Sequence, residues 1–201
     1  MLTVTRRWWL VASCSAPFTL GLTAQSLWVR LDGDDLRVSA PQLRFLNGKS
    51  LERLKDGVPV VFLAQLSLST EVNAPAIKRA VDRFVVSYDV WEERFSVTKT
   101  GGEWRTASNL SSAQTESWCL NHLAIGIEGV APDKPFWLRL EVRAEDARDQ
   151  AAVVRDSGIN LARLIEIFSN PARAQQQRWE ATAGPVRLLD LKRESRGSRS
   201  G

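Results

Sequence analysis

The sequence predicts an α+β fold that is mostly β: an antiparallel, sandwich-like meander of strands with two or three packed helices. Apolar and polar residues alternate through V-P-V-V-F-L-A-Q-L-S-L-S and again through R-F-V-V-S-Y-D-V-W-E-E-R-F-S-V, within the stretch from Gly57 to Lys99. A period of two that is rich in β-branched and aromatic residues is typical of antiparallel strands with one solvent-exposed face. Elsewhere, apolar residues recur at helical spacing next to capping residues.

Length and composition indicate one globular domain, residues 25–191. The 201 residues are 44% apolar and 25% charged, and a chain of this length can bury a core without disulfides or metal. The 27 lysines and arginines outnumber the 23 acids, but two of the arginines lie in residues 1–24, which hold no acid. The remaining 25 positive charges (27 − 2) are nearly balanced by the 23 negative ones, so we expect no nucleic-acid binding.

Residues 1–24 have the layout of a secretory signal peptide. A basic start is followed by an apolar run over residues 8–22 and by the small residues Thr23 and Ala24. This order predicts export, with cleavage after Ala24 and a mature periplasmic chain that begins near Gln25. The run is shorter than the roughly 20 residues that a membrane-spanning helix needs, so a retained membrane anchor is the alternative.

The leader also leaves the export route and lipidation open. Arg6-Arg7 loosely resembles a twin-arginine signal, and V-A-S-C, ending at Cys14, resembles a lipoprotein box. Only six residues separate Arg7 from Cys14, which disfavours lipidation because the apolar region of a signal is longer. Cleavage leaves Cys119 as the single cysteine, so the mature chain forms no internal disulfide.

The domain begins with a predicted hairpin and a short helix. Residues 27–31 and 36–40 alternate on either side of D-G-D-D, which indicates a turn at Gly33, and residues 42–45 continue the second strand. The helix spans residues 50–56, where two leucines are spaced to face the core and a glycine follows.

The predicted centre consists of three long strands and a short one. The first begins after Pro59, where a missing amide is tolerated, and T-E-V-N-A-P connects it to the second at residues 76–90. Residues 91–100 form the third. Because no glycine or asparagine separates the last two, one long bent strand is the alternative. Gly101-Gly102 makes a turn, and residues 103–107 return as a short strand.

The main helix is predicted from Ser111, which forms a capping-box pattern with Gln114, to Gly129. A loop bounded by two prolines follows, and residues 136–143 alternate as a further half-buried strand. The apolar stripe of the helix consists of Trp118, Leu120, Leu123, Ala124 and Ile127.

The C-terminal part is predicted to be more polar. Residues 144–155 suit a weak surface helix or a mobile excursion, and a capped apolar helix follows at residues 159–168. After a linker, a last hairpin over residues 179–191 turns at Gly184-Pro185. Residues 192–201 form a basic tail that is disordered by composition.

The order of these segments resembles a known family. G-V-P-V-V-F, R-F-V-V-S-Y-D-V-W-E-E-R-F-S-V, E-S-W-C-L and P-F-W-L-R-L-E-V-R follow one another after an export signal. This order resembles the exported bacterial family of domain of unknown function 4390 over roughly residues 27–168. The likeness is strongest at Gly57-Val58-Pro59 and Ser87-Tyr88-Asp89, where the family shows a G-V-P-L step and an L-S-Y-x-L segment. The resemblance implies an exported, mostly β, non-catalytic protein, often encoded near membrane sensor kinases, and it brings no catalytic residues.

One pair of residues could carry nucleophilic chemistry. His122, the only histidine, lies three residues after Cys119, so the two could pair as thiolate and base on one helix surface. No third orienting group is identified by spacing, and a buried cysteine beside a partly exposed histidine is the simpler interpretation. We therefore predict no catalytic residues, with a cryptic thiol-dependent hydrolase as an alternative.

Acidic residues form no recognisable ligand set. Asp32, Asp34 and Asp35 lie in a turn too short for a calcium loop, and Glu92 and Glu93 point to opposite faces of a strand. A phosphate-binding glycine loop and a dinucleotide fingerprint are both missing from the sequence. We expect no metal and no cofactor.

Aromatic residues suggest a partner surface. Trp137 alternates with Phe136 and lies close to Arg139 and Arg143, while Trp91 lies among acidic residues. Outward tryptophans beside arginines are typical of protein interfaces, although a second layer of core is the alternative. The six tryptophans after the leader are Trp28, Trp91, Trp104, Trp118, Trp137 and Trp179.

These observations predict an exported, periplasmic, non-catalytic module that binds an envelope or membrane protein or another envelope component. The residues expected to do so are Trp91, Trp137, Arg139 and Arg143. The resemblance adds a link to membrane sensor kinase signalling. A carrier of an apolar envelope molecule, held between sheet and helix, is the other alternative.

Overall fold

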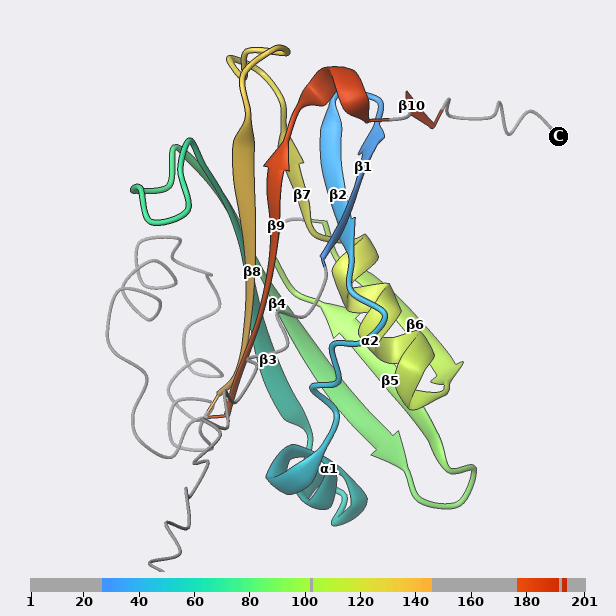
Figure 1. The fold of residues 1–201 in the computed structure, drawn as a ribbon. Coiled ribbons are helices and arrows are strands. Elements are labelled where there is room, and N and C mark those ends of the chain that lie inside the picture. The colour runs from blue at the N-terminus through green and yellow to red at the C-terminus, as the bar shows by residue number, and fades with distance from the viewer. Residues whose placement is uncertain (1–26, 102, 146–176, 192, 195–201) are drawn as a thin grey trace, which may run out of the picture.

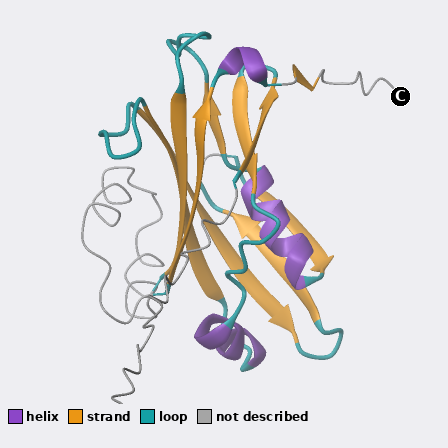
Figure 2. Ribbon diagram, in the orientation of Figure 1, coloured by secondary structure: helices purple, strands orange, loops and turns teal. Residues whose placement is uncertain are grey.

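The computed structural model describes residues 27–101, 103–145, 177–191 and 193–194. Within them the fold is α+β and mostly β, as predicted. The strands form two sheets, shown in Figures 1 and 2: a large sheet in the order β6-β5-β4-β3-β8-β9 and a small sheet in the order β10-β1-β2-β7. No helix in the described ranges is long and apolar enough to cross a membrane. The predicted signal peptide, the helix over residues 159–168 and nearly all of the basic tail lie outside the described residues.

The small sheet is built on the predicted hairpin. Its turn contains Gly33 at φ 63°, a left-handed conformation that suits glycine. β2 also pairs with β7, and β10 runs parallel to β1. The prediction that residues 42–45 extend the second strand is wrong, because they form a loop outside both sheets. The strands are β1 (Trp28–Asp32), β2 (Asp35–Ser39), β7 (Ala124–Gly126) and β10 (Arg193–Glu194).

The large sheet confirms the predicted meander. A turn separates β4 from β5, with Glu93 at φ 52°, so the alternative of one long bent strand is wrong. The carboxylate of Asp89 accepts hydrogen bonds from the amides of Trp91 (2.9 Å) and Glu92 (3.0 Å), which stabilises the turn without glycine or asparagine. The four strands are β3 (Val60–Ser69), β4 (Lys78–Asp89), β5 (Arg94–Lys99) and β6 (Arg105–Leu110).

Two further strands extend the large sheet beside β3. β8 (Phe136–Ala144) lies between β3 and β9 (Arg178–Val186). The predicted hairpin at Gly184-Pro185 is wrong, because β9 continues through both residues, with a register shift opposite β8. A 3-10 helix, η1 (Leu188–Asp190), follows β9.

The described ranges contain two α-helices. α1 (Gly48–Lys55) matches the predicted short helix and packs against β3 and β4. α2 (Ser112–Asn121) begins with the predicted capping box at Ser111. It ends eight residues before Gly129, where the sequence predicted its end, because the chain from Ala124 pairs with β2 instead. The apolar stripe therefore divides between a helix and a strand.

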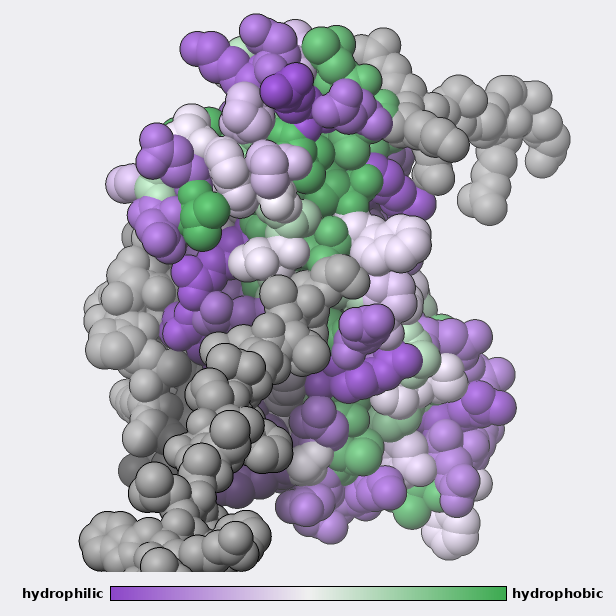
Figure 3. Space-filling model, in the orientation of Figure 1, coloured by the Kyte–Doolittle hydropathy of each residue, from purple (hydrophilic) through white to green (hydrophobic). Residues whose placement is uncertain are grey.

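One hydrophobic core joins the two sheets. Phe62 and Leu66 of β3 meet Leu36 and Val38 of β2 in a single cluster of buried side chains, to which Leu120 of α2 also belongs. Figure 3 shows hydrophobic side chains gathered in the middle of the view, between the two sheets, with hydrophilic ones around them. The opposite face of the large sheet, which we call the outer face, presents the polar positions of its strands.

Candidate functional site

The outer face brings arginines from three strands together. Since side chains alternate along a strand, the register decides which residues share this face. In the first of three adjacent rows, Arg79 of β4, Ser67 of β3 and Arg139 of β8 lie side by side. The next two rows across β4, β3, β8 and β9 are Val81, Gln65, Glu141 and Glu180, and then Arg83, Leu63, Arg143 and Arg178.

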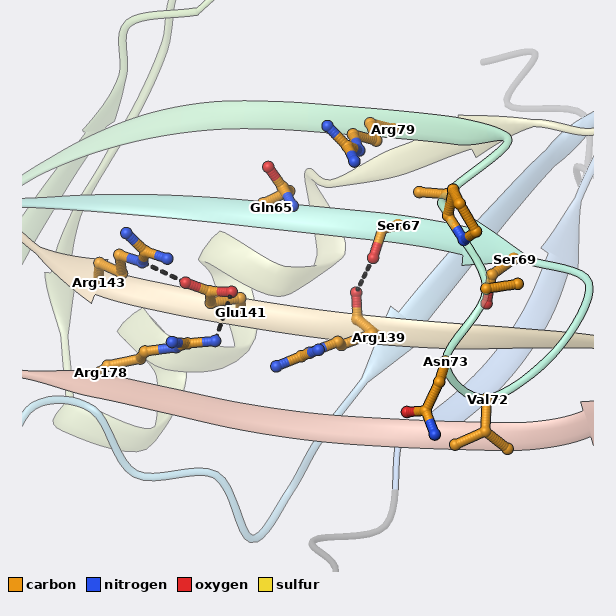
Figure 4. A pocket seen from close by; sticks show the side chains of 13 residues that line it. Gln65, Ser67, Ser69, Val72, Asn73, Arg79, Arg139, Glu141, Arg143 and Arg178 are labelled. Atoms are coloured by element: carbon orange, nitrogen blue, oxygen red, sulfur yellow. Dashed lines mark hydrogen bonds and ion pairs between the residues drawn. The ribbon is translucent and has the colours of Figure 1, made fainter. Parts of the chain in front are cut away.

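These rows surround a hollow of about 490 Å³, which we call the arginine hollow (Figure 4). The connection between β3 and β4 overhangs one end of it, with Val72 and Asn73 on the loop. The described lining residues include four arginines and one glutamate. They are Gln65, Ser67, Ser69, Val72, Asn73, Ala74, Pro75, Ala76, Arg79, Arg139, Glu141, Arg143 and Arg178.

Two carboxylates neutralise part of this charge. Glu141 pairs with the neighbouring Arg143 and with Arg178, at 3.0 Å between Oε2 and Nη2. Glu180, just outside the hollow, pairs with Arg178 and with Arg139, at 2.7 Å between Oε2 and Nη2. The side chains of Glu141 and Arg143 are almost wholly buried, whereas that of Arg139 is half exposed.

The charge that is left over lies at one end of the hollow. Arg79 is exposed and has no ion-pair partner among the described residues. Among the described residues, the four lining arginines stand against Glu141 of the lining and Glu180 just outside it, an excess of two positive charges in this set. Each of the other three arginines contacts a glutamate, so the unpaired positive charge lies at Arg79, next to the partly exposed pair of Arg139 and Glu180.

The structure places the four predicted partner residues in different settings. Trp137, Arg139 and Arg143 share the outer face of β8. Arg143 is buried, 3% exposed, and it is ion-paired rather than presented to solvent. Trp91 is 96% exposed and lies in the turn after β4, beside the start of β3. Trp137, in contrast, pairs with Ser69 at the end of β3. The length of β3, about 30 Å, therefore separates the two tryptophans.

Trp137 also has a packing role that the sequence did not reveal. It is half-buried, and its indole ring lies against the backbone of Gly184 in β9. A Cβ at Gly184 would approach Cδ1 of Trp137 to 2.4 Å, and the φ of this residue is 146°. Both the close approach and the backbone conformation require glycine. The glycine that the sequence placed in a turn instead makes room for the tryptophan.

Cys119 and His122 are not arranged as a nucleophile and a base. Cys119 is 1% exposed, and burial raises the pKa of its thiol far above the usual range, so the thiolate is disfavoured. His122 ends α2, with Nδ1 2.7 Å from the carbonyl oxygen of Trp118 and its ring against that tryptophan. Burial lowers the pKa of His122, which disfavours the protonated imidazolium. This geometry gives no support to the thiol-dependent hydrolase.

The acidic residues of the two turns do not form a shared site. Asp32, at the hairpin turn, pairs with Arg37 at 2.7 Å between Oδ2 and Nε. Glu92 and Glu93 lie in the β4–β5 turn, where both are exposed. No group of three or more His, Cys, Asp or Glu side chains in the described ranges could hold a metal ion.

Comparisons with known proteins give no relative. The chain matches no protein-family model, no curated protein and no solved structure. The site is therefore defined by its geometry alone.

The sequence missed Arg79 and Arg178 as site residues. Arg79 alternates with apolar residues on β4, which predicted its exposure but not which strand would lie opposite. Arg178 and Glu180 alternate around Trp179 in the same way. The pairing of β8 with β3 and β9, across long stretches of sequence, brings these residues together.

Proposed function

We propose that this chain is an exported, non-catalytic module that binds a protein of the cell envelope through the outer face of its large sheet. The observation that carries the proposal is the arginine hollow, in which arginines from β4, β8 and β9 outnumber the carboxylates that pair with them. Arginine and tryptophan are enriched in protein interfaces, and here Trp137 and Arg139 border the same surface.

Two other features support a binding role. The surface is built on paired strands, which hold its side chains in fixed positions, and it is concave rather than flat. Cys119 is buried in α2, and burial disfavours its thiolate, so this residue offers no nucleophile at the surface. The signal-like residues 1–24 support export, and the resemblance to the family of domain of unknown function 4390 makes a membrane sensor kinase the kind of partner to examine first.

Site-specific photo-crosslinking tests the proposal. A photo-reactive residue replaces Val72, which is 68% exposed and lines the hollow, in a chain expressed with its own leader. The matched control replaces Val90, which is 54% exposed in the β4–β5 turn, away from the hollow. We expect one discrete adduct from position 72 and none from position 90. Equal labelling at both positions, or none at either, would contradict the proposed surface.

Cell fractionation with intact-mass measurement tests export. We expect a periplasmic species that begins near Gln25. A full-length or lipidated species in the membrane fraction would show that the module remains tethered, and a full-length cytoplasmic species would refute export.

A further inference from the structure

We propose that the arginine hollow binds a carboxylate or phosphate group, and that Arg79 and Arg139 hold it between them across Ser67. This inference rests on the proposed function and names the chemistry that the same surface recognises. It depends on the spacing of three residues in one row, the pairing state of each arginine and the location of the excess charge.

The spacing suits an oxyanion. Arg79 and Arg139 flank Ser67 in the strand pairing, so their Cα atoms lie about 10 Å apart, two strand spacings. The central side chain is short, and its hydroxyl donates to the carbonyl oxygen of Arg139 at 3.2 Å. The long side chains of the two arginines therefore lie on either side of the short serine side chain (Figure 4). An oxygen-rich group placed over Ser67 is within reach of both.

Both arginines have N–H donors that can bind a ligand oxygen. Arg79 has no ion-pair partner among the described residues, so within these residues no carboxylate occupies its five N–H donors. Arg139 bonds Glu180 through Nη2, but both side chains are partly exposed, and such a pair contributes little to stability. Arg139 can therefore bind a second anion at small cost. Planar guanidinium groups bind carboxylate and phosphate in a bidentate manner, which lysine does not.

The other end of the hollow is already neutralised. Glu141 pairs with Arg143 and Arg178, and it is itself buried, 6% exposed. A second anion there would meet this carboxylate, whereas near Arg79 it would meet a guanidinium that pairs with no carboxylate of the described residues. The electrostatics therefore direct the ligand to the Arg79 end, beneath the loop that carries Val72 and Asn73.

Apolar residues of the overhanging loop favour an oxyanion that belongs to a larger molecule. Val72 and Pro75 of the overhanging loop line the same hollow as the arginine pair. A ligand that carries apolar atoms beside its acidic group removes these apolar side chains from water, whereas a small inorganic ion does not. The favoured ligand is therefore an acidic segment of the partner protein, with glutamate or aspartate side chains at the arginine pair.

Calorimetric titration of the purified mature chain tests this inference. The probes are hexaglutamate, citrate and inorganic phosphate, each at low and at raised salt. Arg79→Gln removes the proposed anchor and breaks no ion pair of the described chain. Arg94→Gln is the matched control, because Arg94 is exposed on the same face of the sheet, on β5 outside the hollow. Thermal melting checks that both variants fold.

We expect hexaglutamate to bind the wild-type chain, more weakly as salt rises, and Arg79→Gln to weaken binding about tenfold while Arg94→Gln changes it less than twofold. Binding of citrate or phosphate with the same dependence on Arg79 would also support the oxyanion site and identify a free anion as its ligand. Equal losses in both variants, or no binding of any probe at millimolar concentration, would overturn the inference.

The crosslinking experiment keeps the two proposals separate. A position-72 adduct that persists in Arg79→Gln, with no oxyanion binding in the titrations, would leave the partner surface standing and remove the oxyanion site. An adduct that Arg79→Gln abolishes, together with binding of hexaglutamate, supports both.

Discussion

The carboxylate of Glu116 is expected to hold the loop between β2 and α1 in place. Glu116 lies in α2 and is 2% exposed. Its Oε1 accepts hydrogen bonds from the backbone amides of Phe45 (2.8 Å) and Leu46 (2.9 Å), and its Oε2 accepts one from Nη1 of Arg44 (3.0 Å). Replacing Glu116 with leucine therefore leaves two buried amides without an acceptor.

The expected loss of stability follows from these contacts. An unsatisfied buried amide costs about 1–3 kcal/mol, so two of them cost about 4 kcal/mol in Glu116→Leu. Glu116→Gln keeps one carboxamide oxygen that can accept from both amides and loses only the charged contact with Arg44. Because Arg44 is half exposed, that contact is worth about 1 kcal/mol or less. Arg44→Ala is the control that removes the same contact from the other side.

Urea unfolding of the chain, followed by tryptophan fluorescence, measures these differences. We expect the order wild type, then Gln and Ala close together, then Leu about 3 kcal/mol below them. If Glu116→Gln and Glu116→Leu agreed within about 0.5 kcal/mol, the two backbone amides would not depend on this side chain, and the account of the loop would be refuted.

Three further predictions concern the strand, thiol and imidazole described above. Gly184→Ala should destabilise the chain by more than about 2 kcal/mol in the same urea assay, because its Cβ would collide with Trp137; unchanged stability would contradict that packing. Mass spectrometry should show that iodoacetamide leaves Cys119 unmodified in the native chain and labels it in urea. Rapid labelling of the native chain would reopen the hydrolase alternative. Burial, and after it the charges of Arg105 and Lys99, lower the pKa of His122 in the folded chain below 6.5, so the unfolded chain binds more protons. The free energy of unfolding should therefore fall as the pH drops through 6.5. If this free energy changed equally with pH between 5.5 and 7 in His122→Gln and in the wild type, the prediction would be contradicted.

The sequence predicted those parts of the fold that depend on local pattern. The alternation in β3 and β4 and the capping box at Ser111 are encoded within a few residues, and the structure confirms them. The length of α2 was wrong because Ala124, which fits a helical stripe, pairs with a strand nearly ninety residues earlier in the chain. Helical spacing cannot report a competing strand partner.

The candidate site was predictable only in part. Trp137 and Arg139 were placed correctly on one face of a strand by their alternation. Arg79 and Arg178 come from strands whose neighbours are set by the order of the sheet, which no local pattern encodes. Glu116 was missed for the same reason, since the amides it binds are about seventy residues away in sequence.

The proposed binding surface is tested most directly by amide chemical shifts of the ¹⁵N-labelled chain during titration with hexaglutamate. We expect the shifts to change at Ser67, Asn73, Arg79 and Arg139 and to stay fixed in the hairpin of β1 and β2, on the other side of the core. Changes that cluster in the hairpin, or that spread evenly over all exposed arginines, would contradict the assignment of the outer face as the site of binding.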